Sequence, residues 1–403
     1  MQARISPEEH RERQRHTREA AAERGLDVVV AFSRGGGTHD RIADVLWLGG
    51  LATPQPFVPD LGGHWRAAGH VAVILPVAGA ATAVVDAEEL QTAPVADSVV
   101  VADDAISAAA DAVAEGLSRR GRGRVGVFGS DALPAAWWSA LDESVRGRRP
   151  DAALEPADDL GLGLRRVKSQ AEQRLLRAAG RLGADAMAAA LDAAVPGARE
   201  AEVAAALFER VVSDGGAVYD VVVSSGAASG TLGPSGGAAG AARWTTRRLA
   251  DGDLLRIDAY GSIGGYLFDF ARTTVVGDAA SGEQRELIDA LRAGVAAGIE
   301  ALRPGVRLSE VARRCDVALA ASSHARRHGV PAHLMGGFWG HGLGLGFEPP
   351  WIGPAADEVV EAGWCLALER RAAVAGVGGA QHEDDVLVGP DGAELLTVGG
   401  PGP

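Results

Sequence analysis

Two aspartates in one short stretch have the types and spacing needed to bind a metal ion. Asp258 and Asp269 stand eleven positions apart in GDLLRIDAYGSIGGYLFDFARTT, residues 252–274. The runs LLRID and GYLFDFARTTVV are apolar, aromatic and β-branched, and the glycine-rich GSIGG joins them, a pattern typical of a β-hairpin. With Asp258 ending the first strand and Asp269 early in the second, the hairpin would direct both carboxylates to one point.

Three further candidate ligands follow later in the chain. His341 lies among glycines in GHGLGLG, where backbone can approach a ligand closely. Glu369 ends the apolar run CLALE, and Glu383 opens the run EDDVLV. One histidine and four carboxylates form a hard, oxygen-rich set that suits Mn, Co, Fe or Zn, and bridging carboxylates can hold two such ions about 3.5 Å apart.

The order of these motifs resembles the pita-bread metallohydrolases, which include methionine aminopeptidase, aminopeptidase P, prolidase and creatinase. The matching stretches are ID, GYLFDFART, GHGLGLG and EDDVLV, in that order, and the resemblance covers nearly the whole chain. It implies two divalent metal ions. Asp258 would bind one ion, His341 and Glu369 would bind the other, and Asp269 and Glu383 would bridge them.

This resemblance also implies a reaction. A water between two divalent ions would lose a proton near neutral pH and attack a carbonyl that one of the ions polarises. Glu369, as in the family's usual assignment, would pass a proton to the leaving nitrogen. The expected activity is hydrolysis of a C–N bond in a small molecule or short peptide, with an Xaa-Pro-like peptide bond as the first candidate.

Several positions depart from the family's pattern. Family peptidases carry a second histidine seven positions after the ligand histidine and another before the first hairpin. Here Glu348 stands seven positions after His341, so that histidine is either deleted or replaced, and the other position falls near Gly233. The family's Pro-Gly after the glutamate ligand is Arg370-Arg371 here, and the arginine that aminopeptidase P has two positions before the last ligand is Gln381.

These departures keep two alternatives open. The missing histidines bind the substrate carbonyl in the peptidases, so their loss favours a non-peptidase of the same fold, a creatinase-like hydrolase or a lyase with a specialised substrate. The other alternative is an inactive binding or scaffold homologue. Five retained ligands speak against it, because converging carboxylates are costly without counter-charge.

Polar residues beside the motifs are candidates to replace the lost groups. Glu348 is a second catalytic candidate, and Arg370 would bind a substrate carboxylate through its planar guanidinium. His382 is a further substrate-binding candidate, and Arg371 is another candidate for a replacement polar group. The alternative interpretation makes Glu348 and Arg371 solvated surface charges, Arg370 the ion-pair partner of a ligand carboxylate, and His382 an outward residue of an edge strand.

Aromatic residues flank the histidine motif. Trp339, Phe347 and Trp351 would form an apolar wall for the substrate, or else simply pack in the core. Two glycine-rich segments carry weaker signals. GGGTHD at 35–40 lacks a nucleotide-binding pattern and is expected at the rim of the site, and GPSGG at 233–237 matches Gly-x-Ser-x-Gly without the strand-to-helix context of a serine hydrolase.

Length and charge set further bounds. The chain has 403 residues, 47% of them apolar, which predicts two domains. Its 39 basic and 53 acidic residues give a net charge of −14, which argues against a nucleic-acid partner. No run reaches membrane-spanning length, the charged start lacks a signal-peptide core, and only two cysteines occur. We expect a cytoplasmic protein without a membrane partner.

The first 163 residues alternate apolar runs with helical patterns, which predicts an α/β domain. The runs LDVVVAF, VLWLGG, HVAVILPV, ATAVVD and RVGVFG are its expected strands. In the resemblance this is the creatinase-like amino-terminal domain, residues 1–163. We expect it to carry the contacts of a homodimer, which the resemblance also implies, and a wall of the substrate site.

Residues 164–403 are the expected pita-bread catalytic domain, and they contain an internal repeat. PGAREAEVA at 196–204 and PGVRLSEVA at 304–312 share Pro, Gly, Arg, Glu, Val and Ala at the same spacing, each after an Ala-rich helix. Gly252 precedes Asp258 by six positions, and Gly363 precedes Glu369 by six. Each half therefore reads helix, turn, helix, hairpin, which predicts a pseudo-twofold α/β domain with the metal ions between its halves.

Overall fold

The computed structural model describes residues 4–34, 42–53, 69–86, 94–117, 123–231, 243–331 and 337–398. The segment 35–40 and the region around Gly233 lie outside these ranges. The chain forms two compact units that meet between Arg165 and Arg166. The first unit ends two residues beyond the predicted boundary because its last helix, α5 (Asp158–Arg165), continues to that point.

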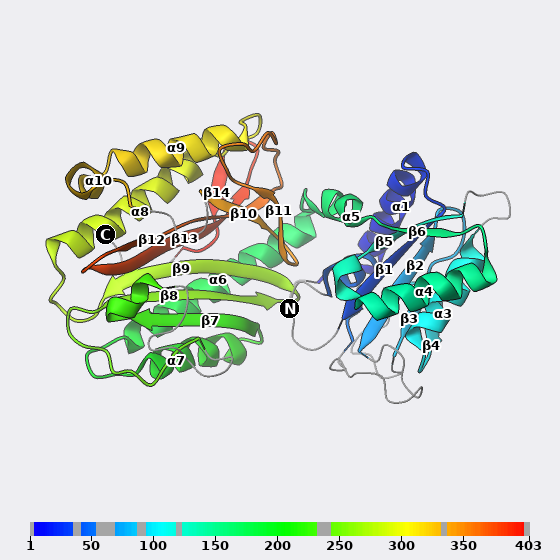
Figure 1. The fold of residues 1–403 in the computed structure, drawn as a ribbon, viewed down its shortest axis with the longest axis horizontal. Coiled ribbons are helices and arrows are strands. Elements are labelled where there is room, and N and C mark those ends of the chain that lie inside the picture. The colour runs from blue at the N-terminus through cyan, green and yellow to red at the C-terminus, as the bar shows by residue number, and fades with distance from the viewer. Residues whose placement is uncertain are drawn as a thin grey trace. The chain divides into compact units, whose positions relative to one another are not determined.

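The first unit is built on a six-stranded sheet with the order β4-β3-β2-β1-β5-β6 (Figure 1). Its central strands are continuous apolar runs, as expected where helices cover both faces of a sheet. β1 runs antiparallel to β2 and parallel to β5. The strands are β1 (Val28–Arg34), β2 (His70–Pro76), β3 (Thr82–Val85), β4 (Ser98–Val101), β5 (Arg124–Phe128) and β6 (Ala153–Pro156).

Helices accompany this sheet, and one of them overturns a prediction. The run VLWLGG, expected as a strand, lies in helix α2 (Ala43–Gly49), which ends at Gly50 with a left-handed φ of 65°. Periodicity cannot separate a short buried strand from a short buried helix in so brief an apolar run. The other helices of this unit are α1 (Pro7–Glu23), α3 (Ala105–Gly116), α4 (Ala135–Arg148) and the 3-10 turn η2 (Ser130–Ala132).

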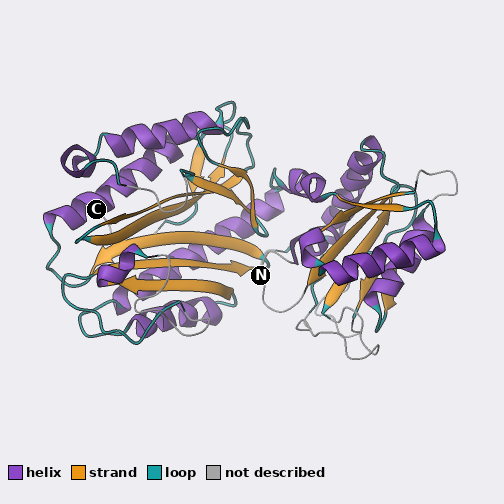
Figure 2. Ribbon diagram, in the orientation of Figure 1, coloured by secondary structure: helices purple, strands orange, loops and turns teal. Residues whose placement is uncertain are grey.

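The second unit, residues 166–403, contains two sheets (Figure 2). One has the order β7-β8-β9 and the other β11-β10-β12-β13-β14. The two sheets meet along β9 and β13, where Gln381 N donates to Thr273 Oγ1 at 2.8 Å. The strands are β7 (Ala217–Ser225), β8 (Leu254–Ile263), β9 (Tyr266–Val275), β10 (Gly340–Leu343), β11 (Phe347–Trp351), β12 (Cys365–Val374), β13 (Gly378–Val388) and β14 (Ala393–Leu395).

Two helix pairs cover one side of these sheets. Apolar side chains of α6 and α7 pack against β7, β8 and β9, and those of α8 and α9 pack against β12 and β13 (Figure 1). Residues that alternate with these packed positions point to the opposite side. The helices are α6 (Gln170–Ala193), α7 (Glu200–Ser213), α8 (Gly282–Ala301), α9 (Leu308–Ala320) and α10 (Ser323–His328), with the 3-10 turn η3 (Gly226–Gly230) after β7.

The repeat predicted from the sequence appears as matching backbone contacts in the two halves. Gly197 N donates to Leu249 O at 2.8 Å, and Gly305 N donates to Val360 O at 2.9 Å. Both glycines have a left-handed φ, 89° and 91°, which the Pro-Gly turn requires before each second helix. The second unit therefore consists of two similar halves, each made of two helices and a long hairpin.

The first hairpin differs from the prediction at its turn. β8 continues to Ile263, so Asp258 lies in the middle of the strand and does not end it. The turn consists of Gly264 and Gly265, whose φ values of 60° and 85° suit a tight hairpin. Gly261 lies inside the strand, and only glycine fits there because a Cβ at this position would lie 2.4 Å from Ala217 O.

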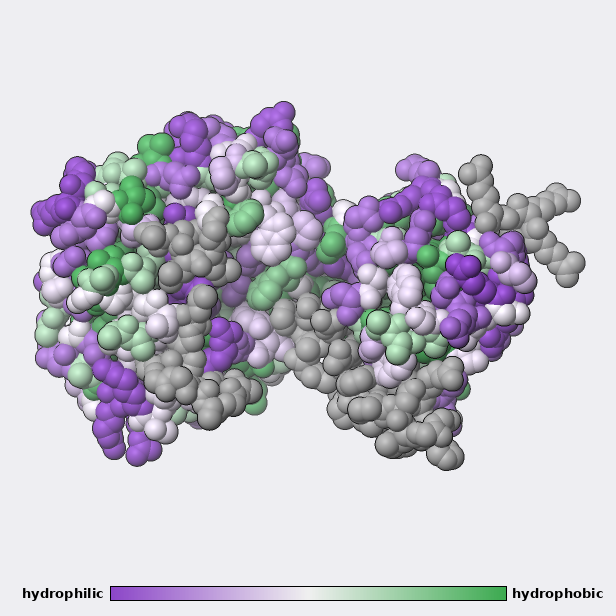
Figure 3. All heavy atoms as spheres, viewed as in Figure 1, coloured by the Kyte–Doolittle hydropathy of each residue, from purple (hydrophilic) through white to green (hydrophobic). Residues whose placement is uncertain are grey.

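On the face seen in Figure 3, hydrophobic residues form small separate patches among hydrophilic ones. Among the helices that the structure describes, none is both long and apolar enough to cross a membrane.

Candidate metal centre

All five predicted ligands line one cavity of about 400 Å³ in the second unit. They come from five strands that lie far apart in the sequence. The ligand residues and their strands are Asp258 of β8, Asp269 of β9, His341 of β10, Glu369 of β12 and Glu383 of β13.

Strand register explains why these side chains meet. Asp269 lies opposite Tyr260, which is two positions after Asp258 on β8, so both aspartates share one face of the hairpin. In the second hairpin Glu369 lies directly opposite Glu383. The helices cover the other face of each sheet, so the carboxylates point toward the cavity.

The tightest part of the cluster contains Asp269, His341 and Glu383, each of which offers a ligand atom within 4.8 Å of the others. His341 Nδ1 lies 3.0 Å from Gly342 O and donates to it. This bond leaves Nε2 facing Asp269 Oδ2 at 3.5 Å. A histidine oriented in this way presents an imidazole nitrogen to a metal ion.

Burial shapes the protonation of these groups. It raises the pKa of Asp258, and it raises the pKa of Glu369 to about 7, with further upward contributions from Asp258 and Asp269. The pKa of Glu383 lies well above its ordinary value for the same reason, burial first and neighbouring carboxylates second. Burial alone would lower the pKa of His341, but the bond to Asp269 and the charges of Asp269 and Glu369 raise it overall.

These residues fit divalent metal ions. Four carboxylates share a buried space in which neighbouring carboxylates add to the raised pKa values of Asp258, Glu369 and Glu383, and bound cations would relieve that repulsion. The donors are oxygens and one imidazole nitrogen, a set that suits Mn, Co, Fe or Zn.

A buried hydrogen-bond network supports the ligands. Arg256 is fully buried, and its Nη1 donates to Gln381 Oε1 at 3.0 Å. Gln381 Nε2 in turn donates to Glu369 Oε2 at 3.1 Å. On the same face, Asp385 Oδ2 accepts a bond from Asp269 N at 2.9 Å. The sequence interpretation gave Arg256 and Asp385 no role, although both lie two positions from a ligand, the spacing that puts them on its face.

Two arginines line the cavity beside the ligands: Arg371, one of the candidate replacement polar groups, and Arg243, which the sequence interpretation did not name. Arg371 is buried, contrary to its interpretation as a solvated charge. Arg243 is half-buried, and its Nη1 lies 2.5 Å from Asp220 Oδ2. Together with Arg256, whose Nη1 is 3.5 Å from Asp258 Oδ2, their charges oppose the burial-driven rise in the pKa of Asp258.

The structure separates the predicted aromatic wall. Phe347 and Trp351 line the cavity and stack edge-on to His341, with ring centroids 5.0 and 5.6 Å away. Trp339 instead lies in the core, and its Nε1 donates to Asp316 Oδ1 at 2.8 Å. Gly340 separates Trp339 from His341 with a φ of 136°, and a Cβ there would lie 1.9 Å from Ala367 O. This backbone turn breaks the regular alternation.

Arg370 and His382 are a register pair on the helix-facing side, away from the cavity. The Arg370 guanidinium carbon lies 4.5 Å from the Trp339 ring centroid, and His382 Nε2 lies 3.1 Å from Asp384 Oδ2. Side chains alternate along a strand, so a residue next to Glu369 or Glu383 points to the opposite face. The structure therefore does not bring these two predicted substrate-binding residues to the site.

Glu348 also lies elsewhere. It is buried on β11, is absent from the cavity lining, and its Oε2 is 3.2 Å from Lys168 Nζ. Both side chains of this ion pair are almost fully buried, so Glu348 is not a solvated charge.

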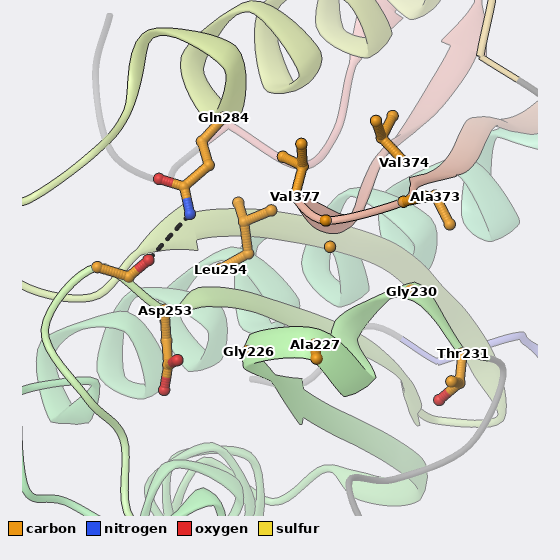
Figure 4. Close-up of a pocket in the computed structure, with 14 residues that line it drawn as sticks. Gly226, Ala227, Gly230, Thr231, Asp253, Leu254, Gln284, Ala373, Val374 and Val377 are labelled. Atoms are coloured by element: carbon orange, nitrogen blue, oxygen red, sulfur yellow. Dashed lines mark hydrogen bonds between the residues drawn. The ribbon is translucent and has the colours of Figure 1, made fainter.

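A second cavity, of about 450 Å³, lies at the tip of the β12–β13 hairpin beside η3 (Figure 4). Glycine, alanine and valine dominate its lining. Its polar side chains hold turns: Gln284 Nε2 donates to Gly252 O at 2.9 Å, and Asp253 accepts a bond from Arg247 at 2.6 Å. We therefore place the functional site at the first cavity.

The fold and the clustered side chains define a candidate metal centre. Residues 174–390 match the profile of Metallopeptidase family M24, and the chain belongs to this family.

Relatives with curated names agree with this assignment. The chain is 31% identical over 266 residues to "Probable dipeptidase PepE" of Mycobacterium tuberculosis, across 66% of each chain. It therefore spans slightly less than two thirds of that relative's length. It is also 29% identical to "Xaa-Pro dipeptidase" of Pyrococcus furiosus, over 64% of this chain and 70% of the relative.

Solved structures confirm the predicted fold class. The prolidase from Pyrococcus horikoshii OT3 superposes with a TM-score of 0.75 at 20% identity, covering 96% of this chain and 99% of that one. The Xaa-Pro dipeptidase from Bacillus anthracis gives a TM-score of 0.76 at 22% identity, with 98% and 99% covered. The fold is therefore shared along both units.

Proposed function

We propose that the protein hydrolyses a C–N bond, of the amide or peptide kind, in a small substrate. The carrying observation is that five ligand-type side chains from five strands line one cavity, with burial raising the pKa values of three of their carboxylates. Membership of a metallopeptidase family and relatives named as dipeptidases support this reaction class.

In this proposal Asp258 would hold one divalent ion, His341 and Glu369 would hold a second, and Asp269 and Glu383 would contribute to holding both. When bound, such ions supply Lewis acidity to a scissile carbonyl and lower the pKa of a water. Mn, Co, Fe and Zn all suit the donor set.

Glu369 is the proposed proton carrier. It lies in the cavity among the other ligand residues, close to where a metal-activated water would attack. Gln381 fixes the orientation of this carboxylate with its 3.1 Å bond to Oε2. The Glu369 carboxylate would receive a proton from the attacking water and pass it to the leaving nitrogen.

One observation favours the alternative of a non-peptide substrate. Seven positions after His341, where the resemblance places the peptidases' carbonyl-binding histidine, the chain has Glu348, which is paired with Lys168. The site thus lacks one carbonyl-binding group of the peptidases. A creatinase-like hydrolase or a lyase that acts on a specialised small molecule fits this loss. Measurable turnover of such a molecule would distinguish this alternative from an inactive scaffold.

The test combines metal analysis with a substrate panel. The purified protein, the Asp258→Ala and His341→Ala variants, and a surface control, Asp185→Asn, are loaded with Mn, Co, Fe or Zn and analysed for bound metal. The same samples are tested on dipeptides, including Xaa-Pro, and on N-acylated amino acids. Metal loss in the two ligand variants together with amide cleavage by the wild type supports the proposal.

Other results redirect it. Metal bound without cleavage of any amide moves the assignment to the non-peptide alternative, and no metal under replete conditions rejects both enzyme proposals.

We also propose a cytoplasmic homodimer. The two cysteines, Cys315 and Cys365, are free and buried, as suits a reducing compartment. Sedimentation equilibrium tests the dimer, and a monomer at micromolar concentration rejects it.

A further inference from the structure

The metal-ligand cavity has a direction that follows its strands. Along β8, the cavity-facing positions run from Tyr260 through Asp258 to Arg256. Along β12, Ala367 comes first and pairs with His341, and Glu369 and Arg371 follow it on the same face. Both strands therefore pass from an aromatic end, across the carboxylates, to a basic end.

The basic end is built from side chains on three strands and an adjoining segment. Arg371 lies opposite Gln381 in the β12–β13 ladder, and Gln381 accepts a hydrogen bond from Arg256. Arg243 joins them from the segment that borders β7, where its carbonyl accepts a bond from Val223 N at 3.0 Å. Arg243 and Arg371 both line the cavity, next to Asp258.

The aromatic end surrounds His341. Phe347 stacks edge-on to both His341 and Tyr260, with its ring centroid 5.0 Å from each. Trp351 and Phe338 extend this wall, and about half of each side chain is exposed to solvent. Aromatic surface left exposed at the mouth of a cavity is suited to an apolar group of a ligand.

We propose that the substrate carries an anionic group, a carboxylate, on one side of its scissile amide and an apolar group on the other. This inference rests on the proposed amide hydrolysis and specifies its substrate class. With the amide at the carboxylate-bound ions, the anionic group meets Arg371 and Arg243, and the apolar group meets Phe347 and Trp351.

The sign of the charge selects the substrate. Ions held by Asp258, Asp269, Glu369 and Glu383 would neutralise those carboxylates, so the field at the basic end would be that of its arginines, with the charge of Arg243 offset by Asp220. A substrate with a free amine at this end would be repelled, whereas a carboxylate would bind guanidinium through charge-assisted hydrogen bonds. The preferred molecule is an N-acylated amino acid or a similar amide acid.

A matched ligand series tests the subsite by binding alone. Isothermal titration of the metal-loaded protein compares 3-phenylpropanoate, 3-phenylpropanamide and 3-phenylpropylamine, which share one apolar body and differ in the charge of the head group. We expect the carboxylate to bind about 10- to 100-fold more tightly than the amide, and the amine to bind most weakly. Equal affinities, or a preference for the amine, overturn the proposal.

Variants separate recognition by arginine from direct binding to the metal ions. Arg371→Gln and Arg243→Gln should each reduce the carboxylate preference about tenfold while bound metal stays constant, and Arg371→Lys should restore part of it. Arg314→Gln, on the exposed surface of α9, is the control. A carboxylate preference that survives in both glutamine variants assigns the carboxylate to the ions and rejects the subsite.

Hydrolysis of a second series distinguishes this proposal from the function on which it rests. N-benzoylglycine, N-benzoylglycinamide and N-(2-aminoethyl)benzamide share one scissile amide and differ only in the head group. Faster turnover of the first supports both proposals. If the titrations show the carboxylate preference but none of the three amides is cleaved, the subsite is retained and amide hydrolysis is rejected. Cleavage at equal rates for all three retains the hydrolysis and rejects the subsite.

Discussion

Glu369 and Glu383 lie directly opposite each other across the β12–β13 ladder, and Gln381 Nε2 is 3.1 Å from one carboxylate and 3.5 Å from the other. Strand pairing thus fixes two like charges side by side whether or not a cation is bound. Repulsion between these two carboxylates destabilises the metal-free protein, and several predictions about metal binding and pH depend on this repulsion.

Removal of the proposed bridging ligand should have the largest effect on metal binding. Asp269→Ala takes away one of the three side chains whose ligand atoms lie within 4.8 Å of one another. We expect metal affinity to fall at least about 100-fold, measured by competition with a chromophoric chelator. Asp289→Asn, on the exposed surface of α8, should bind metal like the wild type. Full metal content in Asp269→Ala would remove this residue from the ligand set.

The stability of the metal-free protein should fall as pH rises. The pKa of Glu369 is about 7 in the folded protein against an ordinary value of 4.5, so the folded state holds its proton more tightly than the unfolded state does. The resulting stability is complete below pH 4.5 and is lost as pH rises to 7. For Glu369 alone it amounts to about 3 kcal/mol.

Urea unfolding of chelator-treated protein at pH 5 and pH 8 measures this loss, with Glu369→Gln as the non-titrating reference. The wild type should lose more stability than the variant over this range, and added metal should reduce the difference. If the two proteins show the same pH dependence, Glu369 does not titrate in this window.

Gln381→Leu should weaken metal binding without removing a ligand. The substitution abolishes the hydrogen bonds that Gln381 exchanges with Glu369 and with the buried Arg256. Loss of a residue that orients a ligand typically costs about 10- to 100-fold in metal affinity, and we expect that range here. Gln173→Leu, which loses a hydrogen bond to Lys168 O, is the control. Unchanged affinity in Gln381→Leu would make the network purely structural.

The buried Lys168–Glu348 pair should behave as a unit. Glu348→Leu alone leaves the Lys168 ammonium buried without the carboxylate that lies 3.2 Å away, at a cost of about 3–5 kcal/mol in unfolding free energy. Lys168→Met combined with Glu348→Leu should recover most of that loss. Chemical denaturation of the two single variants and the double variant measures the coupling, and strictly additive effects would contradict it.

The strongest sequence signals concerned elements that repeat or alternate over many residues. The duplicated Pro-Gly turns predicted two similar halves, and these reappear in the paired contacts of Gly197 and Gly305. Local apolar runs predicted less well. VLWLGG was wrong as a strand because its few residues carry no period, and β8 extends beyond Asp258 because Gly261 fits inside the strand.

Within the site, strand alternation was the signal that we applied incompletely. Glu369 faces the cavity, so Arg371 must share its face and Arg370 must not, yet the sequence interpretation chose Arg370 as the carboxylate-binding residue. Trp339 could not have been placed by the same rule, because Gly340 interrupts the alternation with its left-handed φ. The Lys168–Glu348 pair joins positions 180 residues apart, and no local pattern indicates it.

That ion pair also constrains how the sequence can change by descent. Replacing either residue alone leaves a buried charge without its partner and lowers the stability of the protein. Lys168 and Glu348 are therefore expected to be inherited together or lost together. A relative that has histidine at position 348 should therefore carry an uncharged residue at 168. The route between a peptidase-like site and the present one passes through two positions, and in this structure both of them lie outside the cavity lining.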